Sequence, residues 1–174
     1  YDYSNLLYFL TEKGEIFEYN IKKRTHTLIF EKNNEVLSNN DKVTKIDFYN
    51  GNFFFSTING WIYIFNQIEN KLQYNKRILA HNSEILSFHF GINTQKLFSS
   101  SKQGTFCVID FKENSNNMLS RIDINLSPTS MISDIESYIS NKKYYVLGSS
   151  YNGSLTYLSF DLDDTFDYIK KTLN

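Results

Sequence analysis

The sequence predicts an all-β fold of the β-propeller class, a single domain over residues 1–174 with about four blades of four strands each. Three observations support this prediction. Aromatic residues make up 17% of the chain, and flat rings pack well on pleated sheets. One turn pattern recurs at a spacing close to the length of a propeller blade. The runs on both sides of that turn are apolar nearly throughout, as in strands that are covered on two faces.

The recurring turn is centred on a glycine that follows a hydroxyl residue by three positions. The glycines are 46, 44 and 49 residues apart, at Gly14, Gly60, Gly104 and Gly153. The hydroxyl residues are Thr11, Thr57, Ser101 and Ser150. Glycine supplies a positive φ in a tight hairpin turn, and Asn59 or Asn152 before it gives the Asn-Gly hairpin signal. The repeats are therefore expected at about residues 1–42, 43–84, 85–130 and 131–174.

The strands of each repeat follow from its apolar runs. In the first repeat a hairpin around Gly14 is followed by a strand at 26–30, and an earlier strand is missing. The second repeat predicts strands at 43–48, 52–56, 61–65 and 76–80. The third predicts strands at 85–90, 95–100, 105–109 and 121–126. The fourth predicts strands at 131–138, 143–149 and 154–158, with a further candidate at 166–171.

Two segments of the fourth repeat also carry helix signals. Ser127 and Pro128 resemble a helix start, and Ile132, Ile135 and Ile139 recur at helical spacing. We interpret this segment as a strand, because its apolar pair three residues apart matches the pairs of the second and third repeats. Residues 164–174 are left open between strand and helix, since Asp164 could cap a helix there.

The third repeat resembles a WD40 repeat. Ala80-His81 stands where that family has a Gly-His-like dipeptide, Gln103-Gly104 where it has an Asx-Gly-like turn, and Ile109-Asp110 where it has Trp-Asp. The resemblance implies that His81 and Ser101 join a hydrogen-bond network within the blade, with Gln103 in place of the family's turn aspartate. Asp110 is a further structural position of the repeat.

WD40 propellers usually have more blades than four, so the resemblance implies a partial or open ring. A ring must close so that no strand edge stays unpaired. The alternatives are a closed four-bladed ring with a borrowed first strand, and an open arc completed by a partner's strand.

The sequence contains no motif of a known catalytic site, and we expect no catalytic residue, no metal and no cofactor. His26, His81 and His89 are scattered, and Cys107 lies inside an apolar strand, where an inert buried thiol is expected. The acidic segment 161–167 lacks the glycine and the glutamate of an EF-hand loop. The chain is therefore predicted not to be an enzyme.

The function that fits these observations is a non-catalytic scaffold in an intracellular multiprotein assembly, in the cytoplasm or the nucleus. The net charge of −1 provides no general attraction to nucleic acid or to a membrane surface. Binding is expected from the polar loop that holds Asn33, Asn34, Asn39 and Asn40, and from Trp61. Two alternatives remain: a ribonucleoprotein subunit that contacts RNA phosphates, and a propeller enzyme with a site in the central channel.

Overall fold

Every strand pairs only within one of four antiparallel sheets, and strands are the only extended regular elements described. The computed structural model describes residues 5–32, 36–37, 40–91, 96–110, 121–125, 131–161 and 168–173. In each sheet the spatial order of the strands equals their order along the chain. This arrangement confirms the predicted all-β fold with about four blades.

The first sheet has three strands and the other sheets have four. The first sheet contains β1 (Leu6–Leu10), β2 (Ile16–Asn20) and β3 (Thr25–Phe30). The second contains β4 (Val43–Tyr49), β5 (Asn52–Thr57), β6 (Trp61–Ile68) and β7 (Lys71–Leu79). The third contains β8 (Ile85–Phe90), β9 (Lys96–Ser101), β10 (Thr105–Asp110) and β11 (Arg121–Asn125). The fourth contains β12 (Ile132–Ser140), β13 (Lys143–Ser150), β14 (Leu155–Asp161) and β15 (Tyr168–Leu173).

The described part of each segment with mixed signals is a strand, and Ser127, Pro128 and Asp164 lie outside the described residues. β12 pairs with β13 along its whole length, as predicted, and β15 settles the open question over residues 168–173. The first sheet has no strand beside β1 on the side away from β2, among the residues described. It therefore lacks the innermost strand that β4, β8 and β12 provide in the other sheets, as the sequence predicted.

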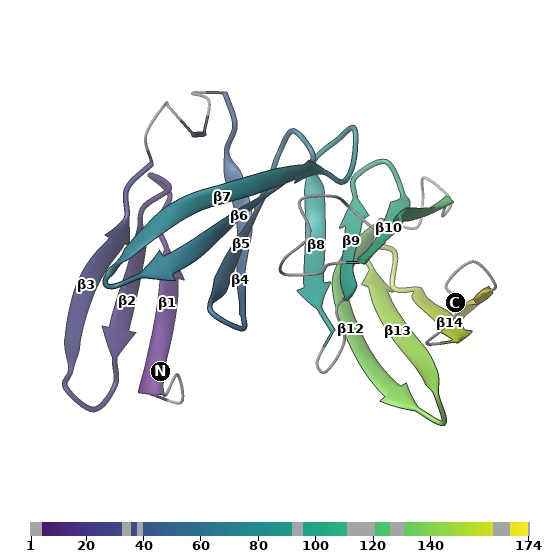
Figure 1. Cartoon of the computed structure of the whole chain (residues 1–174). Coiled ribbons are helices and arrows are strands. Elements are labelled where there is room, and N and C mark those ends of the chain that lie inside the picture. The colour runs from purple at the N-terminus through teal and green to yellow at the C-terminus, as the bar shows by residue number, and fades with distance from the viewer. Residues whose placement is uncertain are drawn as a thin grey trace.

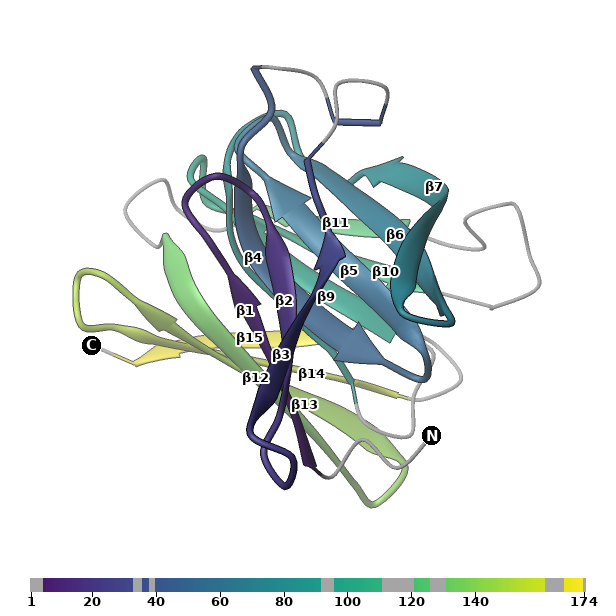
Figure 2. The same ribbon diagram turned by 90° about the vertical axis from the view of Figure 1, so that its left-hand side faces the viewer.

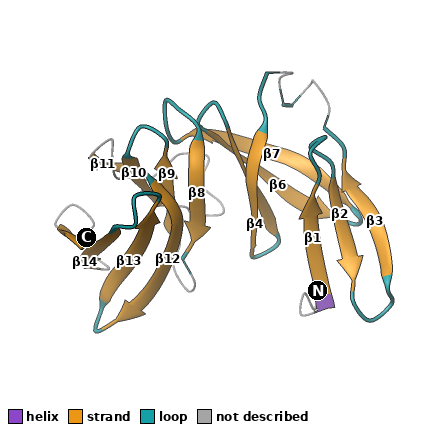
Figure 3. Cartoon of the chain, turned by 180° about the vertical axis from the view of Figure 1, so that it is seen from behind, coloured by secondary structure: helices purple, strands orange, loops and turns teal. Residues whose placement is uncertain are grey.

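The four sheets lie side by side in an open arc, with the first and fourth sheets at opposite ends (Figure 1). Seen from the end of the arc, the first sheet stands in front of the other three (Figure 2). The reverse view shows the same sequence of sheets (Figure 3). The innermost strands contact one another in order, β4 with β8 and β8 with β12. The described chain therefore forms part of a propeller ring.

The glycine turns have the geometry of three-residue hairpin loops. In each, the glycine N–H donates to the carbonyl of the hydroxyl residue three positions earlier, at 2.9 Å for Gly14 and Gly153, 3.2 Å for Gly60 and 3.0 Å for Gly104. The φ angles of the four glycines lie between 74° and 83°. Only the glycine needs the left-handed region, and Asn59 and Asn152 are not among the residues with positive φ.

The hairpins predicted at Asn59-Gly60 and Asn152-Gly153 are therefore confirmed, with three-residue loops. The two-residue turn typical of Asn-Gly joins β4 to β5, where Asn50 has φ 50° and Gly51 has φ 78°. A second turn with two positive φ angles, at Asn141 and Lys142, joins β12 to β13. Asn59 and Asn152 instead precede the glycine of a longer loop.

A β-bulge occurs at the same place in each innermost strand. The register shifts between Val43 and Lys45 in β4, and the shifts in β8 and β12 occur at the corresponding residues. A bulge adds one residue to the strand. Side chains that alternate between the two faces of the sheet therefore change phase once at the bulge. Two apolar residues three positions apart, such as Val43 and Ile46, then face the same core. This geometry explains the apolar pair that recurs in the sequence.

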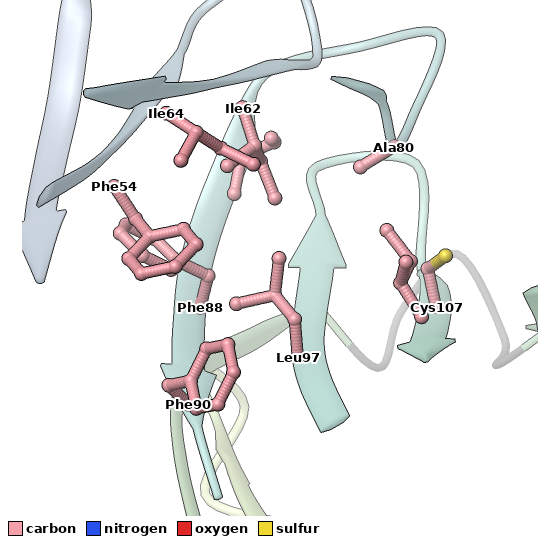
Figure 4. Close-up of a cluster of buried hydrophobic side chains, with 10 residues drawn as sticks. Phe54, Ile62, Ile64, Ala80, Phe88, Phe90, Leu97 and Cys107 are labelled. Atoms are coloured by element: carbon pink, nitrogen blue, oxygen red, sulfur yellow. The ribbon is translucent and has the colours of Figure 1, made fainter. Parts of the chain in front are cut away.

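The core consists of three apolar clusters, each between two successive sheets. In the middle cluster, Phe54, Ile62 and Ile64 of the second sheet face Leu97 and Cys107 of the third sheet (Figure 4). Each such side chain stabilises the fold by about 1.5–3 kcal/mol through burial. The buried residues of these sheets hold the blades at fixed positions.

Only the second and third sheets have both faces covered. β5, β9 and β10 are buried along most of their length, and β6 is buried from Ile62 to Phe65, as predicted. The prediction was wrong for the first and fourth sheets, where Leu7, Phe9, Leu147 and Leu155 are exposed. These sheets stand at the ends of the described arc, so one face of each has no neighbouring sheet.

Candidate interaction surface

His81 is buried in the connection between β7 and β8, where it joins three hydroxyl residues of the third sheet. Its Nδ1 lies 2.7 Å from Oγ1 of Thr105, and its Nε2 lies 2.9 Å from Oγ of Ser99. Ser101 Oγ lies 2.7 Å from the same Thr105 oxygen. The His81 side chain therefore links the chain that enters the third sheet to the hairpin of that sheet.

Ser99 and Thr105 were missed in the sequence, although both belong to the hairpin around Gly104. The hydroxyl of Ser101 lies beside that of Thr105, which in turn contacts His81. Ser99 pairs with Cys107 in the sheet, and its contact with the His81 ring forms only after the chain folds.

Asp110 forms an ion pair with Lys96 across the strand pair β9–β10. The Lys96 side chain is 10% exposed, and its Nζ lies 5.7 Å from the ring centroid of Tyr144 in the fourth sheet. The pair therefore lies at the junction of the third and fourth sheets. The Asp110 side chain is 28% exposed, and its ion pair with Lys96 links the two central strands of the third sheet.

The hydroxyl residues before the glycines differ in their hydrogen bonds. Thr11 and Thr57 each accept the backbone N–H of the residue after the glycine at 3.2 Å. Ser101 bonds to Thr105, and the buried hydroxyl of Ser150 has no partner among the described residues. Three of the four hydroxyls therefore brace the turn, each within its own loop.

The polar loop before β4 is described only in part. Asn33, Asn34 and Asn39 lie outside the described residues. Asn40 is exposed, and its carbonyl accepts a hydrogen bond from Nδ2 of Asn59 at 3.2 Å. The same amide donates to Oδ1 of the buried Asp41 at 3.1 Å. Asn40 is therefore held beside the glycine turn of the second sheet.

Trp61 lies in β6 beside this turn, and Arg77 of β7 covers its ring. The guanidinium carbon is 4.3 Å from the Trp61 ring centroid, within the range of a cation–π interaction. Arg77 Nη1 also donates to the hydroxyl of Tyr63 at 3.4 Å. The Tyr63 hydroxyl in turn donates to Oδ2 of Asp41 at 3.1 Å. A continuous set of contacts thus joins the exposed guanidinium to a buried carboxylate.

We define the Trp61 surface as the exposed and half-buried residues of this set, which lie over the buried Asp41 and Tyr63. Its members are Asn40, Asn59, Trp61 and Arg77. The structure brings two predicted contact residues, Asn40 and Trp61, to the same region. Arg77 was missed, although it follows from the hairpin register, because Tyr63 pairs with Arg77 and Trp61 pairs with Leu79.

The charge of the Trp61 surface is fixed over the physiological pH range. The hydrogen bond with Tyr63 raises the pKa of Arg77, so the guanidinium stays protonated. Burial raises the pKa of the Tyr63 hydroxyl, which therefore stays neutral and keeps its proton for Asp41. A planar cation that is held over an aromatic ring can receive carboxylate or carbonyl oxygens in a defined geometry.

The other candidate groups stand apart from this surface. Cys107 is buried in β10, and His26 is exposed on β3 with its ring 6.0 Å from that of Phe17. His89 is half-buried in β8, and its Nε2 has no hydrogen-bond partner among the described residues. Within the described ranges, no three His, Cys, Asp or Glu side chains are grouped so that they could hold a metal ion.

No helix in the described part of the chain has the length and apolar character needed to cross a membrane.

Comparison with known proteins identifies the fold by structural similarity, whereas comparison of sequences assigns no family. No protein-family model matches the chain, and no curated protein matches it significantly. The solved structure of U3-55K is similar with a TM-score of 0.69 and 11% identity, over 95% of this chain and 48% of that chain. A chain of the mitotic checkpoint complex is similar with a TM-score of 0.64 and 12% identity, over 98% of this chain and 50% of that chain.

The computationally designed Ika4 protein is similar over 91% of this chain and 86% of that chain, with a TM-score of 0.63 and 15% identity. The present chain therefore spans about half the length of two of the three similar chains and most of the third. Together with the four radial sheets, these similarities show that the chain has a β-propeller fold of the WD40 type.

Proposed function

We propose that this chain is a member of the WD40-repeat family that acts as a non-catalytic interaction scaffold, and that it binds a partner protein through the Trp61 surface. The observation that carries the proposal is the exposed Arg77 guanidinium held 4.3 Å from the Trp61 ring. Tryptophan, tyrosine and arginine are the residue types that contribute most to binding at protein interfaces.

The hydrogen bonds beneath the Trp61 surface hold its side chains in place, so a partner can bind with little loss of conformational entropy. Asp41 is 2% exposed and accepts hydrogen bonds from both Tyr63 and Asn59, at 3.1 Å each. Lys32 Nζ also donates to the Asp41 carbonyl at 2.8 Å. Side chains that are already ordered before binding lose less conformational entropy when a partner arrives. The carboxylate therefore acts as a positioning group for Tyr63 and, through it, for Arg77.

One of the similar solved chains belongs to the mitotic checkpoint complex, which is a multiprotein assembly by its name. A propeller of this type in an assembly supports a scaffold role for the present chain, in an intracellular complex. The pairing chemistry of Arg77 favours a partner segment that offers a carboxylate or several carbonyl oxygens.

The experiment compares proteins that co-purify with the tagged chain and with three variants from the cell that produces it. Trp61→Ala and Arg77→Glu should lose the same associated proteins. Lys71→Ala, an exposed lysine on the same strand as Arg77, should retain them and serves as the matched control. Retention of all associated proteins by both Trp61→Ala and Arg77→Glu would contradict the proposal.

The same preparations distinguish the ribonucleoprotein alternative. Nuclease treatment before purification should leave the associated proteins in place if the Trp61 surface binds protein. Loss of these proteins after nuclease treatment, together with binding that weakens strongly as salt increases, would instead assign the surface to RNA phosphates.

A further inference from the structure

A groove lies between the outermost strands of the first and second sheets. β7 extends toward the first sheet (Figure 1) and contacts β3. The groove has a volume of about 450 Å³, and its apolar lining consists of Leu28, Ile29, Phe30, Val36, Phe65, Leu72 and Tyr74. An apolar cavity of about 150 Å³ holds a benzene molecule, so this groove has room for a bulky side chain. It lies at a junction between two described sheets and not at an end of the arc.

The groove has a buried aromatic floor and exposed walls. Phe30 and Phe65 are buried, and their ring centroids are 5.0 Å apart. Leu28 of β3 is 42% exposed and Tyr74 of β7 is 45% exposed. A concave apolar surface bordered by exposed apolar side chains is typical of a binding site. A bulky side chain that enters the groove would remove both exposed residues from water.

The residues that line the groove carry no net charge. Its two charged members are Glu31 and Lys71, which are both exposed and opposite in sign. The groove therefore selects an apolar side chain and not a charged one. Lys71→Ala leaves all the apolar walls in place, so this variant stays suitable as the control for the Trp61 surface.

A row of neighbouring side chains joins the groove to the Trp61 surface. The ring centroid of Tyr74 is 6.4 Å from that of Tyr63, which is 6.0 Å from the guanidinium carbon of Arg77. Tyr63 and Phe65 lie two positions apart in β6, so they share one face of the sheet. Their partners in β7, Arg77 and Tyr74, share that face as well. One surface of the second sheet therefore carries both the cation and the groove.

The strand register gives the separation between the cation and the groove. Arg77 pairs with Tyr63 and Leu72 pairs with Gln67, which lies four positions further along β6. At about 3.3 Å per residue of a strand, this separation is about 13 Å. An extended peptide spans the same distance in about four residues. Because this number is even, two side chains at that separation point to the same side of the peptide.

We propose that the partner of the Trp61 surface binds as an extended segment that carries an acidic residue and a bulky apolar residue about four positions apart. The acidic side chain pairs with Arg77, and the apolar side chain enters the groove between β3 and β7. This inference rests on the proposed function and adds to it the chemical class of the partner segment. A carboxylate and a guanidinium form charge-assisted hydrogen bonds of defined geometry, which fix the position of the segment along the groove.

Synthetic peptides test the proposed segment. Each peptide carries one glutamate and one phenylalanine among serine and threonine residues, in either order, and their separation is increased one residue at a time. NMR titration of the isotopically labelled chain measures the affinity. Binding should be tightest at a separation of about four residues. At that separation, replacing the peptide's phenylalanine with alanine should weaken binding about tenfold, because the groove then stays empty.

Variants of the chain assign each peptide residue to its site. Leu28→Gln should remove the effect of the peptide's phenylalanine and keep the effect of its glutamate, and Arg77→Glu should do the reverse. Tyr74→Ser is a second variant of the groove, at another exposed residue. Ile68→Gln serves as the matched control, because Ile68 is 48% exposed and does not line the groove. It should bind every peptide as the wild type does.

The outcomes separate this inference from the proposed function. Equal binding of the phenylalanine and alanine peptides, with the glutamate still contributing, would overturn the role of the groove and leave the Trp61 surface intact. Failure of all peptides to bind, while Trp61→Ala still loses its associated proteins, would show that the partner is not such a segment. Binding of a short oligouridylate at the same residues, in place of the peptides, would assign the surface to RNA and overturn the inference as well.

Discussion

Gly60 and Gly153 have the same backbone conformation in different surroundings. Both have φ 83° and close the same type of turn. A Cβ on Gly60 would lie 2.0 Å from the carbonyl oxygen of His81, whereas a Cβ on Gly153 would have no atom within 4 Å. Gly60 also accepts the N–H groups of Ala80 and His81 through its carbonyl. The turn between β5 and β6 thus holds residues 80 and 81 in place, where the chain passes from the second sheet to the third.

We therefore expect Gly60→Ala to be much more destabilising than Gly153→Ala. Both substitutions place an L-residue in the left-handed region at a cost of about 1 kcal/mol, and Gly60→Ala adds displacement of the His81 backbone, for a total of about 3 kcal/mol or more. Urea denaturation of the two variants measures the difference. Equal losses of unfolding free energy would show that the contact with His81 does not restrict this position.

At the scale of single residues, the sequence predicted which residues form the turns better than it predicted which side chains contact one another. The glycine and hydroxyl pattern identified all four turns, because a turn is a local structure. Neither Arg77, a member of the Trp61 surface, nor Asp41 beneath it was predicted, since Tyr63 contacts each of them only after the chain folds. The turn type was also missed, because Asn before Gly is compatible with both loop lengths.

The innermost strands β4 and β8 are joined by a half-buried carboxylate. Asp47 of β4 accepts the N–H of Phe48 at 2.7 Å and the N–H of Phe90 in β8 at 3.3 Å. Burial raises the pKa of Asp47 above its usual value, with the two backbone N–H groups acting in the opposite direction. The folded chain therefore binds this proton more tightly than the unfolded chain does.

Stability should consequently depend on pH through Asp47. Because the pKa is raised in the folded state, the contribution of this group is largest below about pH 3.9 and decreases as pH rises through the raised pKa. Asp47→Asn does not titrate, so its unfolding free energy relative to the wild type should increase between pH 4 and pH 7. Urea denaturation at several pH values measures this difference. A constant difference over that range would exclude a raised pKa at Asp47.

At the scale of strands, periodicity was informative where the repeat was clear. The apolar pair three residues apart identified β12 as a strand, and the common bulge provides the reason. The end of the chain could not be assigned in this way. Phe166, Ile169 and Leu173 fit a helix as well as a strand, and only the pairing of β15 with β14 decides between them.

The molecule is held together by contacts between neighbouring sheets. The three apolar clusters lie between the first and second, second and third, and third and fourth sheets. Each sheet therefore depends mainly on the sheets beside it, as in repeat proteins whose stability is a sum of local and neighbour contributions. The second and third sheets have two such neighbours and the end sheets have one.

Hydrogen exchange should reveal this difference in stability between the middle sheets and the end sheets. Amides of β5, β6, β9 and β10 should exchange most slowly, because these strands are covered on both faces. Amides of β1 and β2 in the first sheet, and of β13 and β14 in the fourth, should exchange faster. Mass spectrometry after peptic digestion resolves these segments. Uniform protection across all four sheets would show that the chain opens only as a whole.

At the scale of the whole molecule, the repeat predicted about four blades, and the resemblance to WD40 repeats implied a partial or open ring, with a closed four-bladed ring as an alternative. The exposure of the end sheets was not predicted, because Leu7 and Leu147 belong to apolar runs much like those of the buried strands. Burial on the second face depends on a neighbouring sheet, and local sequence carries no information about that neighbour.

The tight turns between the first and second strands of the second and fourth sheets lie at the opposite ends of the strands from the glycine loops. Asn141 and Lys142, which form one of these turns, are exposed. A fluorophore or an affinity handle grafted there would project from the rim remote from Trp61. Imaging and capture reagents built on this turn would leave the contact between Trp61 and Arg77 undisturbed.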